Sequence, residues 1–139
     1  MSGNNLVSGA NAHNINTGAA YVFEKIGGTW SLEAKLTAAG GHVNDYFGSA
    51  VAIEDDWIVV GAYGVNLQVG SAYAFSRASG TWKQKKQFEP KLHGSPAPDA
   101  DATNACFGVK GIALQNHTLM VGAAYVINKG AAYVFSDAV

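Results

Sequence analysis

Short apolar segments alternate with polar turns along the whole chain, and their spacing predicts a β protein. The clearest stretch is residues 47–88, in which three apolar segments are followed by one with long polar side chains between aromatic ends. Four short strands joined by tight turns, all within about fifty residues, are typical of an antiparallel meander. No stretch has apolar positions at helical spacing. The predicted strands of this unit are residues 47–53, 57–62, 70–76 and 82–88.

One residue pattern recurs three times and predicts a repeat protein. The string Gly-x-Ala-Tyr-x-Phe occurs at residues 18–23, 70–75 and 130–135. A short apolar stretch ending in Gly-Ala precedes each copy. Such internal similarity indicates one supersecondary unit used several times, each unable to bury its faces alone.

The repeat predicts blades of a β-propeller. Buried inner strands with a polar outer strand fit a blade, whose outer edge lies in solvent. The chain, a single repeat domain over residues 1–139, then contains about two and a half blades. They are a partial blade with strands two to four (residues 6–36), a full blade (residues 47–88) and a partial blade with strands one to three (residues 107–136).

The repeated motifs resemble those of a known family. Phe47-Gly48, residues 59–62 and residues 70–75 resemble the FG-GAP repeat of integrin α-subunit N-terminal propellers and of many bacterial surface and secreted proteins. Phe107-Gly108 with residues 121–123 and 130–135 repeats the pattern, and residues 7–10 with 18–23 form a partial copy. The resemblance implies an all-β fold of FG-GAP-type β-propeller blades, each an antiparallel four-stranded meander. It also implies a binding or adhesion function and an extracellular or cell-surface location, although residues 1–5 carry no signal peptide.

Metal sites are not expected. The integrin-like repeat binds calcium in an Asp-rich loop between strands one and two, but residues 54–56 and 115–117 offer too few oxygen ligands. The resemblance is therefore to the bacterial, calcium-free form. Residues 99–104 have the oxygen spacing of a calcium loop but lack its Gly and Glu, so we interpret residues 92–105 as a surface insertion. The four histidines lack zinc-site spacing, and we expect no metal or cofactor.

The chain also lacks a recognisable catalytic set. It has no nucleophile elbow, and Cys106 has no evident base partner. The acids Glu54-Asp55-Asp56 are better read as a turn than as an acid/base pair. A formal net charge of −1 provides no basic field for nucleic acid, and the longest apolar run, residues 57–65, is too short to span a bilayer. We therefore expect a protein that is not an enzyme.

The candidate ligand-binding residues lie on connections that vary between repeats. Connections between strands two and three and between strands four and one meet at the same end of a meander, which in integrin-like propellers carries the ligand. Binding residues concentrate on loops held by a rigid frame. Asp45, in one of these loops, is expected to hydrogen-bond local backbone. The candidates are Asn11, His13, Asn14, His42, Asn44, Tyr63, Asn66, Tyr125 and Asn128.

The ligand and the assembly remain open at this point. A protein ligand fits an adhesion module, a glycan ligand would make the chain a lectin through Tyr63, Tyr125 and the asparagines, and a fragment of a hydrolase is a further alternative. The two partial blades would expose apolar faces and unpaired strand edges, which promote association. The sequence therefore predicts that the chain partners with itself, as a homodimer or a higher ring.

Overall fold

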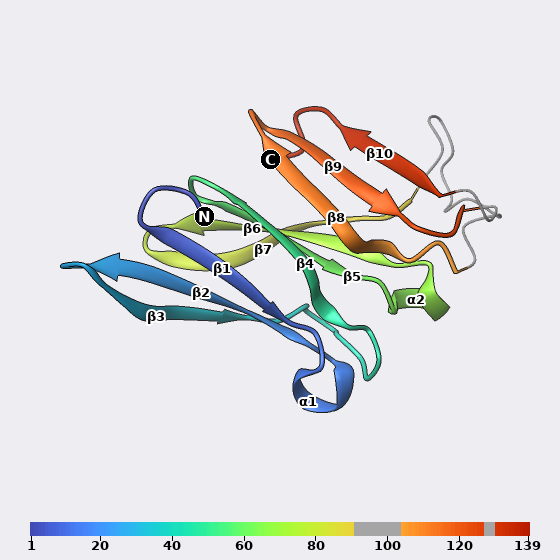
Figure 1. Ribbon diagram of the computed structural model, residues 1–139, viewed down its shortest axis with the longest axis horizontal. Coiled ribbons are helices and arrows are strands. Elements are labelled where there is room, and N and C mark those ends of the chain that lie inside the picture. The colour runs from blue at the N-terminus through green and yellow to red at the C-terminus, as the bar shows by residue number, and fades with distance from the viewer. Residues whose placement is uncertain (91–103, 127–129) are drawn as a thin grey trace.

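The computed structural model describes residues 1–90, 104–126 and 130–139, which form three antiparallel sheets stacked side by side (Figure 1). The first sheet contains β1 (Asn5–Ala10), β2 (Ala19–Ile26) and β3 (Thr29–Leu36). The second contains β4 (Phe47–Glu54), β5 (Trp57–Ala62), β6 (Ser71–Ala78) and β7 (Thr81–Phe88). The third contains β8 (Phe107–Gln115), β9 (Thr118–Ala123) and β10 (Ala131–Phe135). Each sheet is a meander of sequence neighbours, so the predicted all-β fold with blade-like meanders is confirmed.

Two short helical turns interrupt the strands. α1 (His13–Asn16) joins β1 to β2, and α2 (Val65–Gln68) joins β5 to β6. They lie at the same repeat position, at corresponding ends of their sheets (Figure 1). The sequence did not predict them because four residues are too few to show helical spacing.

The strands that begin with Phe-Gly bend toward the preceding sheet. The register of β4 with β5 shifts between Phe47 and Val51, and that of β8 with β9 shifts between Phe107 and Ile112. Such bulges bend a strand and increase its twist. Gly48, at a φ of +95°, adopts a backbone conformation that other residues rarely reach. The bend brings Phe47 beside Gly18 of the first sheet, with which it forms a parallel bridge.

The core lies between the sheets. On β5, Ile58 and Val60 face the first sheet while Val59 faces the third, and all three are fully buried. This explains why the inner strand is apolar at successive positions: both of its faces are covered. β7 lies at the edge of its sheet and exposes Lys83 and Lys85 to solvent.

The outer two sheets are each packed on one face only within the described part of the chain. Trp30 and Leu32 on β3 remain 38% and 58% exposed, on the face of the first sheet that is turned away from the second. Met120 and Val134 are 49% and 59% exposed on the far face of the third sheet. Trp30, Met120 and Val134 occupy the repeat positions of Trp82, Val59 and Ala74, which are buried where two sheets meet.

Candidate functional site

The variable connections form one continuous surface. We call it the loop surface, and it comprises residues 11–18, 37–46, 63–70, 104–106 and 124–126. The backbone N–H of Tyr46 donates to the Asn16 carbonyl at 2.8 Å, and that of Gly64 donates to the Asp45 carbonyl at 3.0 Å. The chain of contacts continues through the N–H of Tyr125, which donates to the carbonyl of Ala105 at 3.2 Å. Loops from all three sheets are thereby fixed relative to one another.

Two of these loops contain a left-handed turn of three consecutive residues. In α1 the turn is Asn14, Ile15 and Asn16, with φ between 50° and 60°. In α2 it is Asn66, Leu67 and Gln68, with φ between 52° and 69°. A left-handed conformation costs an L-residue about 1–2 kcal/mol, less for Asn, so the surrounding structure has to hold it in place.

The hydrogen bonds to the neighbouring sheet explain how the turns are held. Gly18 N–H donates to the His13 carbonyl at 2.9 Å and closes the first turn, and Gly70 N–H donates to the Val65 carbonyl at 2.9 Å in the second. The carbonyl of Gln68 then accepts the N–H of Cys106 at 2.8 Å, just as Asn16 accepts that of Tyr46. Each turn is therefore a rigid platform, tied to the next sheet.

The tips of these platforms are apolar and exposed. Ile15 is 74% exposed and Leu67 is 88% exposed, and they occupy the same position of the repeat. Val43 and Tyr125, on neighbouring loops, are 54% and 61% exposed. Exposed apolar side chains on a soluble fold are common singly, but a group on one face marks an interaction site.

A polar cluster lies between the first two platforms. The amide of Asn16 donates to Asn44 Oδ1 at 3.2 Å and to the Tyr46 hydroxyl at 3.3 Å. The Tyr46 ring stacks on the Tyr63 ring with centroids 4.6 Å apart and an interplanar angle of 12°. Burial raises the pKa of Tyr63, and the adjacent Tyr46 adds to the effect. The raised pKa keeps the Tyr63 phenol neutral at physiological pH, so this side chain offers hydrogen bonds and no charge.

Asp45 stabilises the loop of residues 37–46, to which Asn44 and Tyr46 belong. It is 8% exposed, and its Oδ2 accepts the backbone N–H of His42 at 2.7 Å, which confirms the expected local hydrogen bond. The imidazole of His42 itself is exposed, with its Nδ1 3.8 Å from the same carboxylate oxygen. His13 lies apart from it, beside Lys35 Nζ at 3.2 Å and against the edge of the Tyr21 ring.

The structure places most predicted site residues on the loop surface. Asn44 and Tyr63 are brought together through Asn16 and Tyr46, while Tyr125 lies on the more distant loop of the third sheet. Asn128 lies outside the described residues, as do residues 99–103 of the segment considered as a calcium loop. The other predicted residues on this surface are Asn11, His13, Asn14, His42 and Asn66.

Sequence reasoning missed four residues of this surface: Asn16, Tyr46, Ile15 and Leu67. Tyr46 directly precedes the Phe-Gly pair, and nothing in its sequence neighbourhood marks it as a contact residue. The recurrence of an apolar residue at positions 15 and 67, each between two amide residues, is the signal that identifies the tips.

The described residues contain little that resembles catalytic machinery. Burial raises the pKa of the Cys106 thiol, which makes the reactive thiolate scarce. Glu54 accepts backbone N–H groups of the third sheet, Asp56 pairs with Arg77, and Asp55 is exposed, so the three acids do not converge. Among residues 1–90, 104–126 and 130–139, no three His, Cys, Asp or Glu side chains are grouped to bind a metal. In the same residues, no helix has the length and apolar character needed to cross a bilayer.

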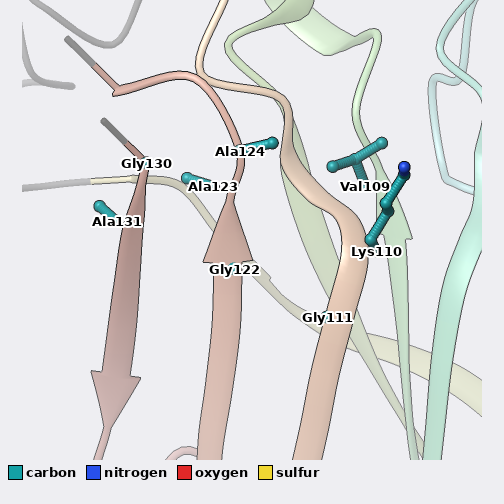
Figure 2. Close-up of a pocket in the computed structure, with 8 residues that line it drawn as sticks. All are labelled: Val109, Lys110, Gly111, Gly122, Ala123, Ala124, Gly130 and Ala131. Carbon is teal, nitrogen blue, oxygen red and sulfur yellow. The ribbon is translucent and has the colours of Figure 1, made fainter. Parts of the chain in front are cut away.

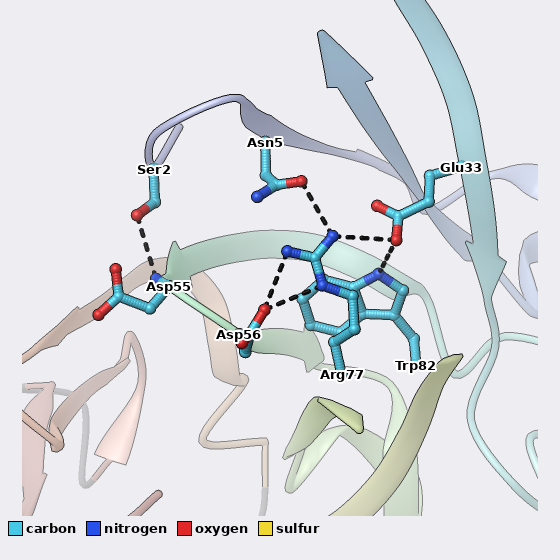
Figure 3. A network of polar contacts seen from close by, with 7 residues as sticks. All are labelled: Ser2, Asn5, Glu33, Asp55, Asp56, Arg77 and Trp82. Atoms are coloured by element: carbon cyan, nitrogen blue, oxygen red, sulfur yellow. Dashed lines mark hydrogen bonds and ion pairs between the residues drawn. The ribbon is translucent and has the colours of Figure 1, made fainter. Parts of the chain in front are cut away.

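A network of ion pairs lies at the opposite end of the sheets (Figure 3). Arg77 pairs with Asp56 at 2.9 Å and with Glu33 of the first sheet at 3.1 Å. Trp82 donates its indole N–H to the same Glu33 oxygen at 3.0 Å, and the Arg77 guanidinium lies over its ring. The hydrogen bonds to both carboxylates raise the pKa of Arg77 although burial opposes the charge. The network joins the first sheet to the second.

Comparison with protein-family models identifies one repeat. Residues 30–75 match the model of the FG-GAP repeat, a segment that begins in β3 and ends within β6. The match therefore includes Phe47-Gly48. A comparison with curated proteins found no match.

Proposed function

Because the chain carries an FG-GAP repeat, we propose that it is a non-catalytic binding or adhesion module that binds its ligand through the loop surface. The observation that supports this most is the pair of exposed tips, Ile15 and Leu67, each displayed on a left-handed turn at the same repeat position. A fixed platform loses little entropy when a partner binds, and exposed apolar area supplies the free energy. FG-GAP repeats are generally found in non-enzymatic, extracellular proteins, which supports an extracellular or cell-surface location for this chain.

A protein ligand accounts for this surface better than a glycan. Sugar recognition needs aromatic faces that are free to stack, but the ring of Tyr63 already stacks on Tyr46. The aliphatic tips beside the amides of Asn14 and Asn66 resemble a protein interface, with an apolar centre and a polar rim. Tyr125, which is exposed, is the residue that a lectin would use.

The experiment measures binding of the labelled chain to arrays of extracellular proteins and of glycans. We expect binding to a protein that is lost in the double variant Ile15→Ser and Leu67→Ser. The control is Ile26→Ser, which removes another exposed isoleucine (63%) from the β2–β3 hairpin at the other end. Binding only to glycans, with loss in Tyr125→Ala, would replace the proposal with a lectin. Equal loss in the control variant, or turnover in a broad hydrolase screen, would overturn it.

The second part of the proposal concerns assembly. The exposed apolar faces of the first and third sheets support association with a second copy, most simply as a homodimer that closes a ring. Light scattering on a size-exclusion column measures the mass directly. A discrete dimer or trimer is the expected result, and a monodisperse monomer with a cooperative melt would contradict it.

A further inference from the structure

The loop surface carries almost no charge. Within its five segments, residues 11–18, 37–46, 63–70, 104–106 and 124–126, Asp45 is the single Asp, Glu, Lys or Arg. Its carboxylate is covered by the loop itself: the residue is 8% exposed, and Oδ2 accepts the backbone N–H of His42 at 2.7 Å. Lys35 borders the surface, with its Nζ 3.2 Å from His13 Nε2. A partner that docks on these segments therefore meets no exposed carboxylate, ammonium or guanidinium.

Charged side chains gather instead at the opposite end of the sheets. There Arg77 pairs with Asp56 and with Glu33, and Glu54 and Asp55 precede Asp56 on the same turn (Figure 3). The chain has 9 Lys and Arg and 10 Asp and Glu in all, so charged residues are available to it. The lack of charge is therefore a property of the loop surface and not of the overall composition.

Amide side chains take the place of charges on the loop surface. Each apolar tip lies between two of them, in Asn14-Ile15-Asn16 and in Asn66-Leu67-Gln68. An amide can donate and accept hydrogen bonds at the same time. Asn14 and Asn66 are exposed, so they can bond to a partner. The amide residues of the whole surface are Asn11, Asn14, Asn16, Asn44, Asn66, Gln68 and Asn104.

A surface of this kind discriminates between partners by their charge. A carboxylate or ammonium group that docks here loses its water and gains no opposite charge, which is unfavourable. An uncharged polar group loses little, because the side-chain amides replace its hydrogen bonds to water. Apolar side chains gain free energy when they cover the exposed tips. Charged partners are thus rejected by the penalty of an unpaired charge, which is one way that specificity arises.

From the uncharged platforms and their amide-flanked tips, we propose that the loop surface binds an uncharged segment of a protein. Apolar side chains of that segment contact Ile15 and Leu67, and its peptide groups and uncharged polar side chains exchange hydrogen bonds with Asn14 and Asn66. This partner class rests on the proposed function of the loop surface and adds to it the absence of Asp, Glu, Lys and Arg at the centre of the contact. The affinity depends little on ionic strength, because salt screens interactions between charges.

The first test is a selection from a phage-displayed library of random linear peptides. Peptides that bind the double variant Ile15→Ser and Leu67→Ser are removed, and the rest are panned on the unaltered chain. We expect the retained peptides to contain Asp, Glu, Lys and Arg at no more than half of their share in the unselected library. Retained peptides rich in these four residues would overturn the proposal. So would the failure of every peptide to distinguish the chain from the double variant.

Amide NMR spectra then locate the most enriched peptide on the chain. We expect shifts concentrated at residues 14–16, 43–46 and 66–68. A different opening lies at the third sheet, where Figure 2 shows Lys110, Gly122 and Gly130 lining a hollow of about 430 Å³. Shifts confined to the residues of that hollow would refute the assignment to the loop surface.

Matched substitutions test the role of charge directly. Asn66→Asp keeps the shape of the side chain and a residue type that tolerates the φ of 52°, and it should weaken binding of the enriched peptide by about tenfold or more. Asn4→Asp, the same change on the exposed turn before β1, should leave binding unchanged, as should Lys35→Gln at the border of the surface. Raising NaCl from about 50 to about 500 mM should change the affinity by less than about threefold. Undiminished binding in Asn66→Asp, or a much larger effect of salt, would contradict the proposal.

The outcomes separate this partner class from the proposed function. Binding of a charged protein on the arrays, lost in the double variant at Ile15 and Leu67, would leave the proposed function standing and refute the uncharged partner. Array binding that is lost equally in the Ile26→Ser control would refute the proposed function, whatever residues the selected peptides contain.

Discussion

Glu54 of the second sheet accepts the backbone N–H of Asn116 of the third sheet, with 2.7 Å between Oε1 and nitrogen. The equivalent contact between the first two sheets uses Ser2, whose hydroxyl oxygen accepts the N–H of Asp55 at 3.0 Å (Figure 3). Ser2 and Glu54 occupy the same repeat position. Side chains at the turn of one sheet thus fix the turn of the next, at the end opposite the loop surface.

Removal of this contact should destabilise the chain. We expect Glu54→Ala to lower the free energy of unfolding by about 1.5–3 kcal/mol, the range for hydrogen bonds to charged groups, with the lower end favoured by partial exposure. Urea denaturation monitored by circular dichroism measures the change. Asp55→Asn removes an exposed neighbouring carboxylate, keeps a residue type that tolerates the φ of 49°, and should change stability by less than about 0.5 kcal/mol. Equal effects in the two variants would contradict the structural role of Glu54.

The close approach of Gly61 to Gly108 makes a second prediction. Gly61→Ala should cost about 1–3 kcal/mol or more, because the added methyl group collides with backbone that cannot move without separating the second and third sheets. Thermal and urea denaturation give the value. Gly122→Ala is the matched comparison: the same substitution at the same repeat position, where no described residue comes closer than 3.7 Å to the added Cβ, should be close to neutral. Similar losses in both variants would show that glycine is needed for the strand itself.

Leu67 is expected to respond to substitution in an unusual way. Glycine normally destabilises a surface position, but Leu67 has a φ of 57°, a conformation that costs a leucine about 1–2 kcal/mol. Relief of that cost exceeds the added entropy of glycine in the unfolded chain, so Leu67→Gly should raise stability by about 0.5–1 kcal/mol. Leu67→Val should lower it, since β-branched residues tolerate positive φ poorly. A less stable glycine variant would argue against the left-handed turn.

Stability should fall at alkaline pH. Burial raises the pKa of Tyr73, with a contribution from the nearby Asp45 carboxylate, and burial also raises that of Tyr63. As the pH rises above about 10, the unfolded chain releases these protons while the folded chain retains them. The unfolded state then binds fewer protons, so the free energy of unfolding decreases with pH, by up to about 1.4 kcal/mol per unit for each group.

The variant Tyr73→Phe tests the alkaline effect. Between pH 9 and about 11 its stability should decline less steeply than that of the unaltered chain, while the two pH profiles run parallel below about pH 8. Urea midpoints across the pH series measure both slopes. Identical slopes above pH 10 would exclude Tyr73 as a source of the alkaline loss.

Much of the fold could be predicted because strands leave a local signal. Three local features located the strands to within a few residues: the alternation in residues 47–88, the Gly-Ala ends and the three Gly-x-Ala-Tyr-x-Phe strings. The prediction of an all-β fold with blade-like meanders is confirmed. The expected hydrogen bond of Asp45 to local backbone was also predictable, since its partner His42 is three residues away. The division of the chain into blades, the site residues and the partners remain predictions.

The composition of the candidate site was harder to predict because it depends on distant contacts. Asn14 and Asn66 each favour a single left-handed residue, but a run of three such residues has no local signal, since the turns are held by N–H groups of Tyr46 and Cys106. For the same reason the stacking of Tyr46 on Tyr63 joins residues from two connections and has no sequence signature.

The sequence by itself determined where the strands and repeats lie, because side-chain alternation and turn residues act over a few positions. Only the tertiary structure decided what each repeated glycine does. Gly61 and Gly122 are equivalent in the sequence, but the backbone of a neighbouring sheet packs against Gly61, whereas Gly122 lines an open hollow. That difference arises from packing between sheets, which depends on what lies across the interface and not on the residue or its neighbours along the chain.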